Sequence, residues 1–117
     1  MQVVLTDPSK ANLVDYFIQE ILQTNLQKPQ KRRIAEKIKG SYLFQASGMT
    51  SIVNFNGESV EIGPSATGKI GAKVRGDLNT LLEIVLGANY ILLYLKGKIR
   101  INGNLVKLLK LLKLLRM

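Results

Sequence analysis

The sequence predicts a single α+β domain over residues 1–117, in which helices cover an antiparallel sheet. The apolar pattern has a helical period of about 3.6 near the start, a period of two after Ser41, and a helical period again after Gly76. A length of 117 residues suits one hydrophobic core. Because the chain has no cysteine, packing and not disulfides must hold that core together.

The N-terminal segment predicts two helices. Asp7 and Pro8 are typical of a helix start, with Asp7 as the N-cap and Pro8 in the first turn. The helix that follows gathers its apolar side chains on one stripe, formed by Leu13, Val14, Phe17, Ile18, Ile21 and Leu22. After a polar break, Pro29 can begin a second, shorter helix that Gly40 ends.

Four strands are expected between Ser41 and Arg75. Their residues alternate in polarity or are rich in β-branched and aromatic types, over residues 42–46, 51–55, 59–62 and 69–74. Between the second and third strands, Asn56 and Gly57 favour a type I′ turn, because both tolerate the positive φ that such a turn needs. We therefore expect these two strands to form an antiparallel hairpin.

The C-terminal third of the chain returns to helical signals. Asp77 can cap a helix that Gly87 ends, and Asn104 can cap a last helix rich in leucine. The segment between these helices, residues 88–96, is apolar enough for either a buried strand or a buried helix. Periodicity does not separate the two possibilities.

The last helix has an unusual charge pattern. Its cations, Lys107, Lys110, Lys113 and Arg116, recur every third residue, so each is rotated back by about 60° from the one before. The apolar surface between them is wider than a helix on one core face needs. Three interpretations remain open: a helix in a groove with its lysines reaching outward, a helix in a membrane interface, and a helix that lines a ligand cavity.

The chain is strongly basic, with 17 Lys and Arg against 8 Asp and Glu and a net charge of +9. Such a field attracts polyanions. On the second helix, residues 28–39 hold six cations with no aromatic residue between them, which disfavours nucleic-acid binding by stacking. A solvated basic face and attraction to anionic headgroups both remain open. The candidate membrane-docking residues are Lys28, Lys31, Arg32 and Arg33.

Catalysis and metal binding are not expected. The chain has no histidine and no cysteine, which removes the commonest general base and the commonest transition-metal ligands. Residues 63–69 (GPSATGK) are similar to a phosphate-binding loop, but Ile70 replaces the required hydroxyl and a strand is expected next. We expect no catalytic residue, metal or cofactor. Without a secretory signal or a run of about 18 apolar residues, we expect a cytoplasmic location.

Two short motifs carry a family resemblance. They are residues 53–57 (VNFNG) and, above all, residues 97–104 (GKIRINGN) before the leucine-rich helix. With the helix after Asp77 between them, they make the last two thirds of the chain resemble the sterol-carrier-protein family. The resemblance implies a helix at residues 88–96 and a fifth strand at residues 98–102, which together give a five-stranded antiparallel sheet covered by about five helices. It also implies an apolar tunnel between the sheet and the helices on one of its sides.

The resemblance also implies a function, which is non-catalytic binding and transfer of a lipid, fatty-acyl or sterol-like ligand. Such a cargo gains about 25 cal/mol for each Å² of apolar surface that the cavity hides from water. The side chains expected to line the cavity are Leu82, Val85, Ile91, Leu92, Leu108, Leu111 and Leu112. Two alternatives remain: a basic nucleic-acid-binding module, and an accessory or oligomerisation domain whose last helix packs on a partner chain.

Overall fold

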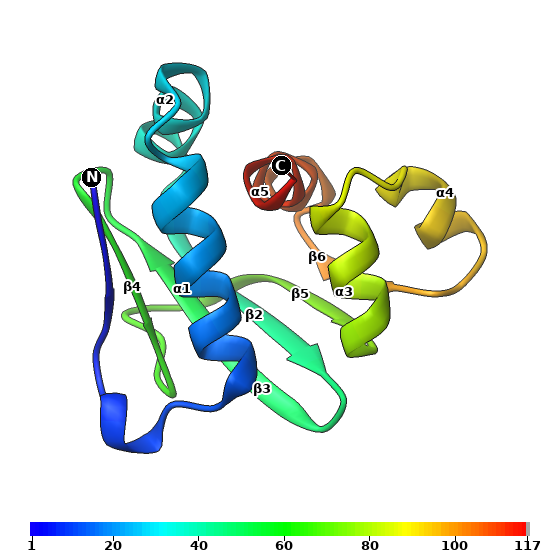
Figure 1. The fold of residues 1–117 in the computed structure, drawn as a ribbon, viewed down its shortest axis with the longest axis horizontal. Coiled ribbons are helices and arrows are strands. Elements are labelled where there is room, and N and C mark those ends of the chain that lie inside the picture. The colour runs from blue at the N-terminus through cyan, green and yellow to red at the C-terminus, as the bar shows by residue number, and fades with distance from the viewer. Residues whose placement is uncertain (117) are drawn as a thin grey trace.

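A six-stranded sheet is the base of the fold (Figure 1), in a computed structural model that describes residues 1–116. Its strands lie in the order β1-β4-β3-β2-β5-β6. They are β1 (Gln2–Leu5), β2 (Gly40–Ala46), β3 (Met49–Phe55), β4 (Ser59–Gly63), β5 (Ile70–Gly76) and β6 (Arg100–Gly103). Met117, the last residue of the predicted domain, lies outside the described residues.

The predicted α+β class is confirmed, but the sheet has six strands in place of five and is mixed. β1 runs parallel to β4, and β2 runs parallel to β5. The other three pairs, β2 with β3, β3 with β4 and β5 with β6, are antiparallel. β1 has only four residues, which is too few for their polarity pattern to predict a strand. Its position in the sheet depends on pairing with a distant segment, such as Val3 with Val60.

The β3–β4 hairpin is confirmed, but its turn is not the predicted type I′. Gly57 has a φ of 90°, while Asn56 is not among the residues with positive φ. The Asn56 side chain organises the turn instead, because its Oδ1 accepts hydrogen bonds from the backbone N–H groups of Glu58 at 2.8 Å and Ser59 at 2.7 Å. An Asn side chain that accepts hydrogen bonds from the next backbone N–H groups can stabilise a turn even when the Asn itself has a negative φ.

Within residues 1–116, five α-helices accompany the sheet. They are α1 (Leu13–Asn25), α2 (Pro29–Lys37), α3 (Leu78–Val85), α4 (Tyr90–Leu95) and α5 (Leu105–Leu115). α4 confirms the helix that the family resemblance implies at residues 88–96. α2 ends at Lys37, and the predicted stop residue Gly40, with a φ of 115°, begins β2 instead.

The start of α1 differs from the prediction. Asp7 and Pro8 belong to a separate 3₁₀ turn over Pro8–Lys10, and Asp7 makes no capping bond to it. Asn12 caps α1 in a reciprocal capping box with Asp15, which satisfies two backbone N–H groups at once. The predicted role of Asp7 as the cap of the long helix is therefore wrong, because Asn12 provides the stronger cap closer to the apolar stripe.

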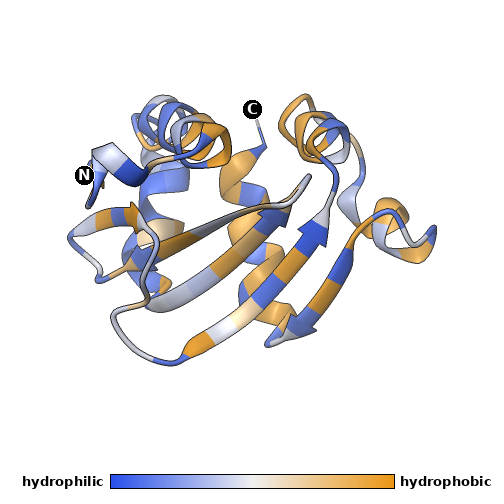
Figure 2. Cartoon of the chain, turned by 90° about the horizontal axis from the view of Figure 1, so that it is seen from below, coloured by the Kyte–Doolittle hydropathy of each residue, from blue (hydrophilic) through white to orange (hydrophobic). Residues whose placement is uncertain are grey.

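The helices gather on one side of the sheet, with α4 at the edge of the molecule (Figure 1). α1 packs on β1, β3 and β4, while α5 packs on β5 and contacts α1, α2 and α3. Figure 2 shows that polar and apolar residues alternate along the strands. It also shows that apolar residues dominate α5, which lies behind them. The side chains of α1 and α5 that are fully buried in the core are Val14, Ile18, Leu22, Leu108, Leu111, Leu112 and Leu114.

A buried polar network fixes the loop before β5. Asn54 Oδ1 accepts hydrogen bonds from the Ser41 hydroxyl and, at 3.0 Å, from the Thr67 backbone N–H. Asn54 Nδ2 donates to the Ser65 carbonyl at 3.2 Å. The glycine-rich segment at residues 63–69 is thus tied to the sheet as a structural turn.

We predict that Asn54→Ala lowers the free energy of unfolding by about 1–3 kcal/mol, because the buried hydroxyl of Ser41 and the backbone N–H of Thr67 lose their shared acceptor. Urea unfolding measures the change. Asn102→Ala on β6 is the matched control, since its exposed side chain makes no hydrogen bond within residues 1–116. We expect the control to change stability by less than about 0.5 kcal/mol. Equal losses in the two variants would contradict the proposed role of the network.

Candidate functional site

Four of the seven predicted ligand-binding residues lie in the core, where α3 and α5 meet the sheet. Leu108, Leu111 and Leu112 on α5 are completely buried, and Val85 on α3 is almost completely buried. All four belong to the continuous core of buried apolar residues. In this structure they pack within the core and do not line an open tunnel.

The other three predicted residues lie on outer surfaces of α3 and α4. Leu82 is 37% exposed, Ile91 51% and Leu92 48%, so the structure does not bring all seven side chains into one cavity. α4 has the sequence YILLYL, and only its Leu93 is buried. Because this helix is apolar all round, its sequence does not indicate which side chains face the solvent.

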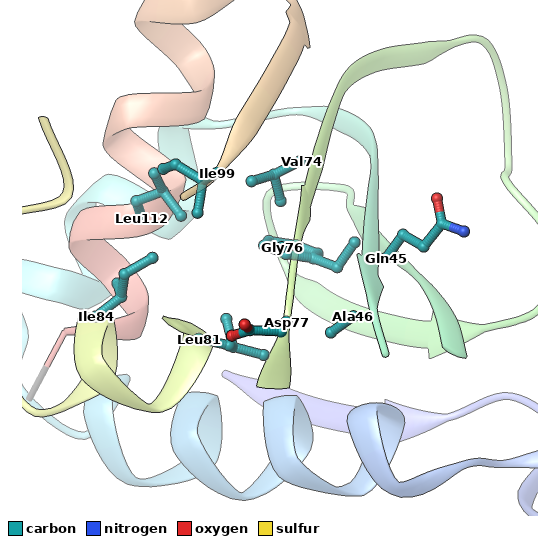
Figure 3. A pocket seen from close by; sticks show the side chains of 10 residues that line it. Gln45, Ala46, Val74, Gly76, Asp77, Leu81, Ile84, Ile99 and Leu112 are labelled. Atoms are coloured by element: carbon teal, nitrogen blue, oxygen red, sulfur yellow. The ribbon is translucent and has the colours of Figure 1, made fainter. Parts of the chain in front are cut away.

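A small cavity, named here the inner recess, lies between α3, α5 and the strands β2 and β5 (Figure 3). Its volume of about 20 Å³ holds about one water molecule. Leu81 and Ile84 from α3, Ile99, and Leu112 from α5 line it. Only Leu112 was predicted, although the i, i+3 spacing of Leu81 and Ile84 could have indicated the other two helical positions.

A larger depression, named here the outer groove, lies between α4, β6 and the first half of α5. Its volume is about 200 Å³. Five aliphatic side chains and one tyrosine line it: Ile91, Tyr94, Leu95, Ile101, Leu105 and Leu109. Ile91 is the one predicted ligand-binding residue in this groove. The alternation of Ile99 and Ile101 in residues 97–104 is the sequence signal that could have located the β6 wall.

The outer groove lies within an exposed apolar face. Of the eleven exposed large apolar side chains in residues 1–116, eight fall between Leu82 and Val106. Four of these eight, Ile91, Tyr94, Leu95 and Leu105, also line the outer groove, and they form the apolar face. Clustered exposed apolar residues of this kind typically mark a ligand, membrane or protein interaction site.

The predicted membrane-docking residues lie together at the start of α2, with Lys28 as its N-cap. Lys28, Arg32 and Arg33 are exposed, and Lys31 is half-buried. Burial lowers the pKa of Lys31 below its ordinary value, and the nearby charges of Lys28, Arg116 and Lys113 lower it further. The cations of α2 and the end of α5 therefore share one region of positive potential.

Asp77 holds the first turn of α3, which carries two walls of the inner recess. Its Oδ1 accepts a hydrogen bond from the Thr80 backbone N–H at 2.7 Å. Hydrogen bonds from Thr80, with a smaller contribution from the charge of Lys98, hold the pKa of Asp77 below its ordinary value. The predicted cap at Asp77 is confirmed.

Within residues 1–116, no group of three or more Asp, Glu, His or Cys side chains is placed to bind a metal ion. Over the same residues, no helix has the length and apolar character needed to cross a bilayer.

This arrangement of sheet and helices is found in solved sterol carrier protein 2 domains, which defines the structural class. The SCP2 domain of the ubiquinone synthesis protein UbiJ matches with a TM-score of 0.70 and 18% identity, over 88% of each chain. Apo sterol carrier protein 2 from Yarrowia lipolytica matches with a TM-score of 0.63 and 20% identity, over 94% of this chain and 92% of that one. Sterol carrier protein domain 2 of Helicoverpa armigera matches with a TM-score of 0.62 and 19% identity, over 90% of each chain.

A comparison of sequence alone gives the same assignment. Residues 18–116 match the SCP-2 sterol transfer family. The chain therefore belongs to the SCP-2 sterol transfer family, as its resemblance to sterol carrier proteins indicated. No sequence among curated proteins matches it.

We predict that acid weakens the wild-type protein more than an Asp77→Asn variant, in which the cap is kept but cannot titrate. A carboxylate with a depressed pKa in the folded state stabilises the fold above its unfolded pKa of about 3.9, and this contribution is lost as pH falls through the folded value. Urea unfolding at about pH 6 and about pH 3 measures the difference. Asp7→Asn controls for the loss of one negative charge, and equal acid sensitivity of wild type and Asp77→Asn would contradict the prediction.

Proposed function

We propose that this chain is a non-catalytic carrier that binds a lipid, fatty-acyl or sterol-like ligand and transfers it between membranes. The observation that carries the proposal is the outer groove, which is lined by aliphatic and aromatic side chains and opens on the apolar face. Membership of the SCP-2 sterol transfer family supports it. Concave sites with such linings are typical of apolar ligands.

The groove and the recess lie on either side of one wall. Ile99 faces the inner recess and Ile101 faces the outer groove, while on α5 Leu112 lines the recess and Leu109, about one turn earlier, lines the groove. Residues 99–101 and the turn of α5 from Leu109 to Leu112 therefore lie between the two spaces.

The groove must widen to hold a whole ligand, because its volume of about 200 Å³ is below the range of about 300–1,000 Å³ that is usual for ligand pockets. α4 is the element that moves in this proposal. It has six residues and one buried side chain, Leu93, so displacing it costs few apolar contacts. The cargo replaces these contacts and gains about 25 cal/mol per Å² of apolar surface buried.

Membrane contact is the second part of the proposal. Each cation near an anionic membrane surface contributes about 1 kcal/mol of attraction. Lys28, Lys31, Arg32 and Arg33 on α2 would supply this attraction while cargo is exchanged. The expected cytoplasmic location and the absence of catalysis remain parts of this proposal.

Two observations weigh against the alternative functions. Tyr42 and Phe44, the aromatic residues nearest the basic helix in sequence, are 1% and 2% exposed, so they offer no platform for stacking nucleic-acid bases. Five leucines of α5 lie in the core, which leaves mainly Leu105 and Val106 of that helix for a partner chain.

We predict that Leu105→Glu weakens the binding of a fluorescent fatty acid by about tenfold or more, because a charge in the groove replaces an apolar contact worth about 1.5–3 kcal/mol. The matched control is Leu13→Glu, at an exposed position at the start of α1, and it should bind like the wild type. Fluorescence titration at low and high salt measures the affinity, and apolar binding should survive high salt. Equal affinities of the two variants, together with native mass spectra that show no co-purified lipid, would contradict the carrier proposal.

A further inference from the structure

A second hollow lies on a different side of α5 from the outer groove. α2 and α5 contact each other, and the space between them has a volume of about 340 Å³. This hollow, named here the basic cleft, is lined by Ile34, Lys37, Ile38, Lys107, Lys110 and Lys113. The fold thus joins two basic segments that are far apart in the sequence.

The charges around the basic cleft are all of one sign. Each charged side chain that lines it is a lysine. The ion pairs found within residues 1–116 join Lys10 to Asp7 and Arg32 to Glu36, and neither involves a lysine of the cleft. Four ammonium groups around one hollow repel each other and attract an anion into it.

The floor of the basic cleft is apolar. Ile38 is almost completely buried and Ile34 is partly buried, and both line the space between the lysines. A free inorganic ion or a polynucleotide backbone gains nothing from such a floor. An amphiphile does, because its anionic group meets the ammonium groups while its first carbons cover the isoleucines.

We propose that the basic cleft binds the phosphate headgroup of an anionic membrane lipid. The ammonium groups of Lys37, Lys107, Lys110 and Lys113 donate to the phosphate oxygens, and Ile34 and Ile38 contact the carbons next to the headgroup. The proposal rests on the membrane contact suggested above, but it does not require a cargo in the outer groove. It gives the three-residue spacing of the α5 lysines a role, because that row forms one wall of the site.

Two double charge reversals test the site. Lys110→Glu with Lys113→Glu changes the α5 wall, and Lys73→Glu with Arg75→Glu makes the same change in net charge at exposed positions of β5. Binding is measured by cosedimentation with phosphatidylcholine vesicles that contain phosphatidic acid. The cleft variant should bind about tenfold or more weakly than wild type, and the control should change by no more than about threefold. Equal losses in the two variants overturn the proposal, because net charge alone would then govern binding.

Calorimetric titration separates a lipid headgroup from a free phosphate. The wild type should bind monomeric short-chain phosphatidic acid more tightly than glycerol 3-phosphate, and Ile34→Ser should reduce that preference. Equal affinities for the two compounds overturn the assignment to a lipid. Tighter binding of a single-stranded DNA oligonucleotide than of the vesicles also overturns it.

The fatty-acid assay on the same variants separates this site from cargo binding. The variant with Lys110→Glu and Lys113→Glu should lose vesicle binding and keep the fluorescent fatty acid. Loss of both activities overturns a separate headgroup site. A wild-type protein that takes up no fatty acid but still shows cleft-dependent vesicle binding supports this inference and removes only the cargo proposal.

Discussion

The packing of α5 against the sheet is the constraint on which the rest of the structure depends. Five leucines of this helix are buried, and its end is tied down by two further contacts. Asn25 Nδ2 donates to the Leu114 carbonyl at 2.7 Å, and the Arg116 guanidinium donates to the Gly87 carbonyl at 2.7 Å. A rotation of α5 by one residue position, about 100°, would bury lysines in the core, which is far more costly than losing a leucine contact. The outer groove and the basic cleft keep their linings because α5 cannot turn.

Most elements of the fold could be predicted because their signals are local. Asp77 and Asn104 cap their helices as their side chains suggest, since an N-cap acts within three residues of itself. Pairing between strands is not local. The parallel alignment of β2 with β5 depends on how the chain crosses the sheet, and β1 is a strand only because the edge of β4 is available to it. The cap of α1 was also mispredicted. Asp7 and Pro8 have the residue types of a helix start, but Asn12 and Asp15 form the capping box of α1.

The candidate site was less predictable than the fold because burial is decided by tertiary packing. The apolar character of residues 88–96 was evident, yet α4 turns Leu93 inward and leaves Ile91 and Leu92 outside. In a helix without a polar face, nothing in the sequence chooses between these orientations. Leu108, Leu111 and Leu112 lie on the helix that lines the outer groove, but their side chains face the sheet and are buried in the core. The basic cleft could not be predicted for a different reason. Its two walls, α2 and α5, are far apart in the sequence and meet only in the fold.

The three-residue spacing of the α5 lysines follows from the different neighbours that surround this helix. At about 100° per residue, the buried leucines occupy one arc, and Leu105 and Leu109 occupy the next arc, towards the outer groove. Lys110 and Lys113, which line the basic cleft, occupy the remaining arc. Lys107, about 60° from Lys110, lies in the first turn, before the buried leucines begin at Leu108. A helix with a regular 3.6-residue pattern has one apolar and one polar face, so it could form the core contact and only one of the two hollows. Packing in a groove and lining a depression are therefore compatible interpretations of α5, because each describes a different side of it.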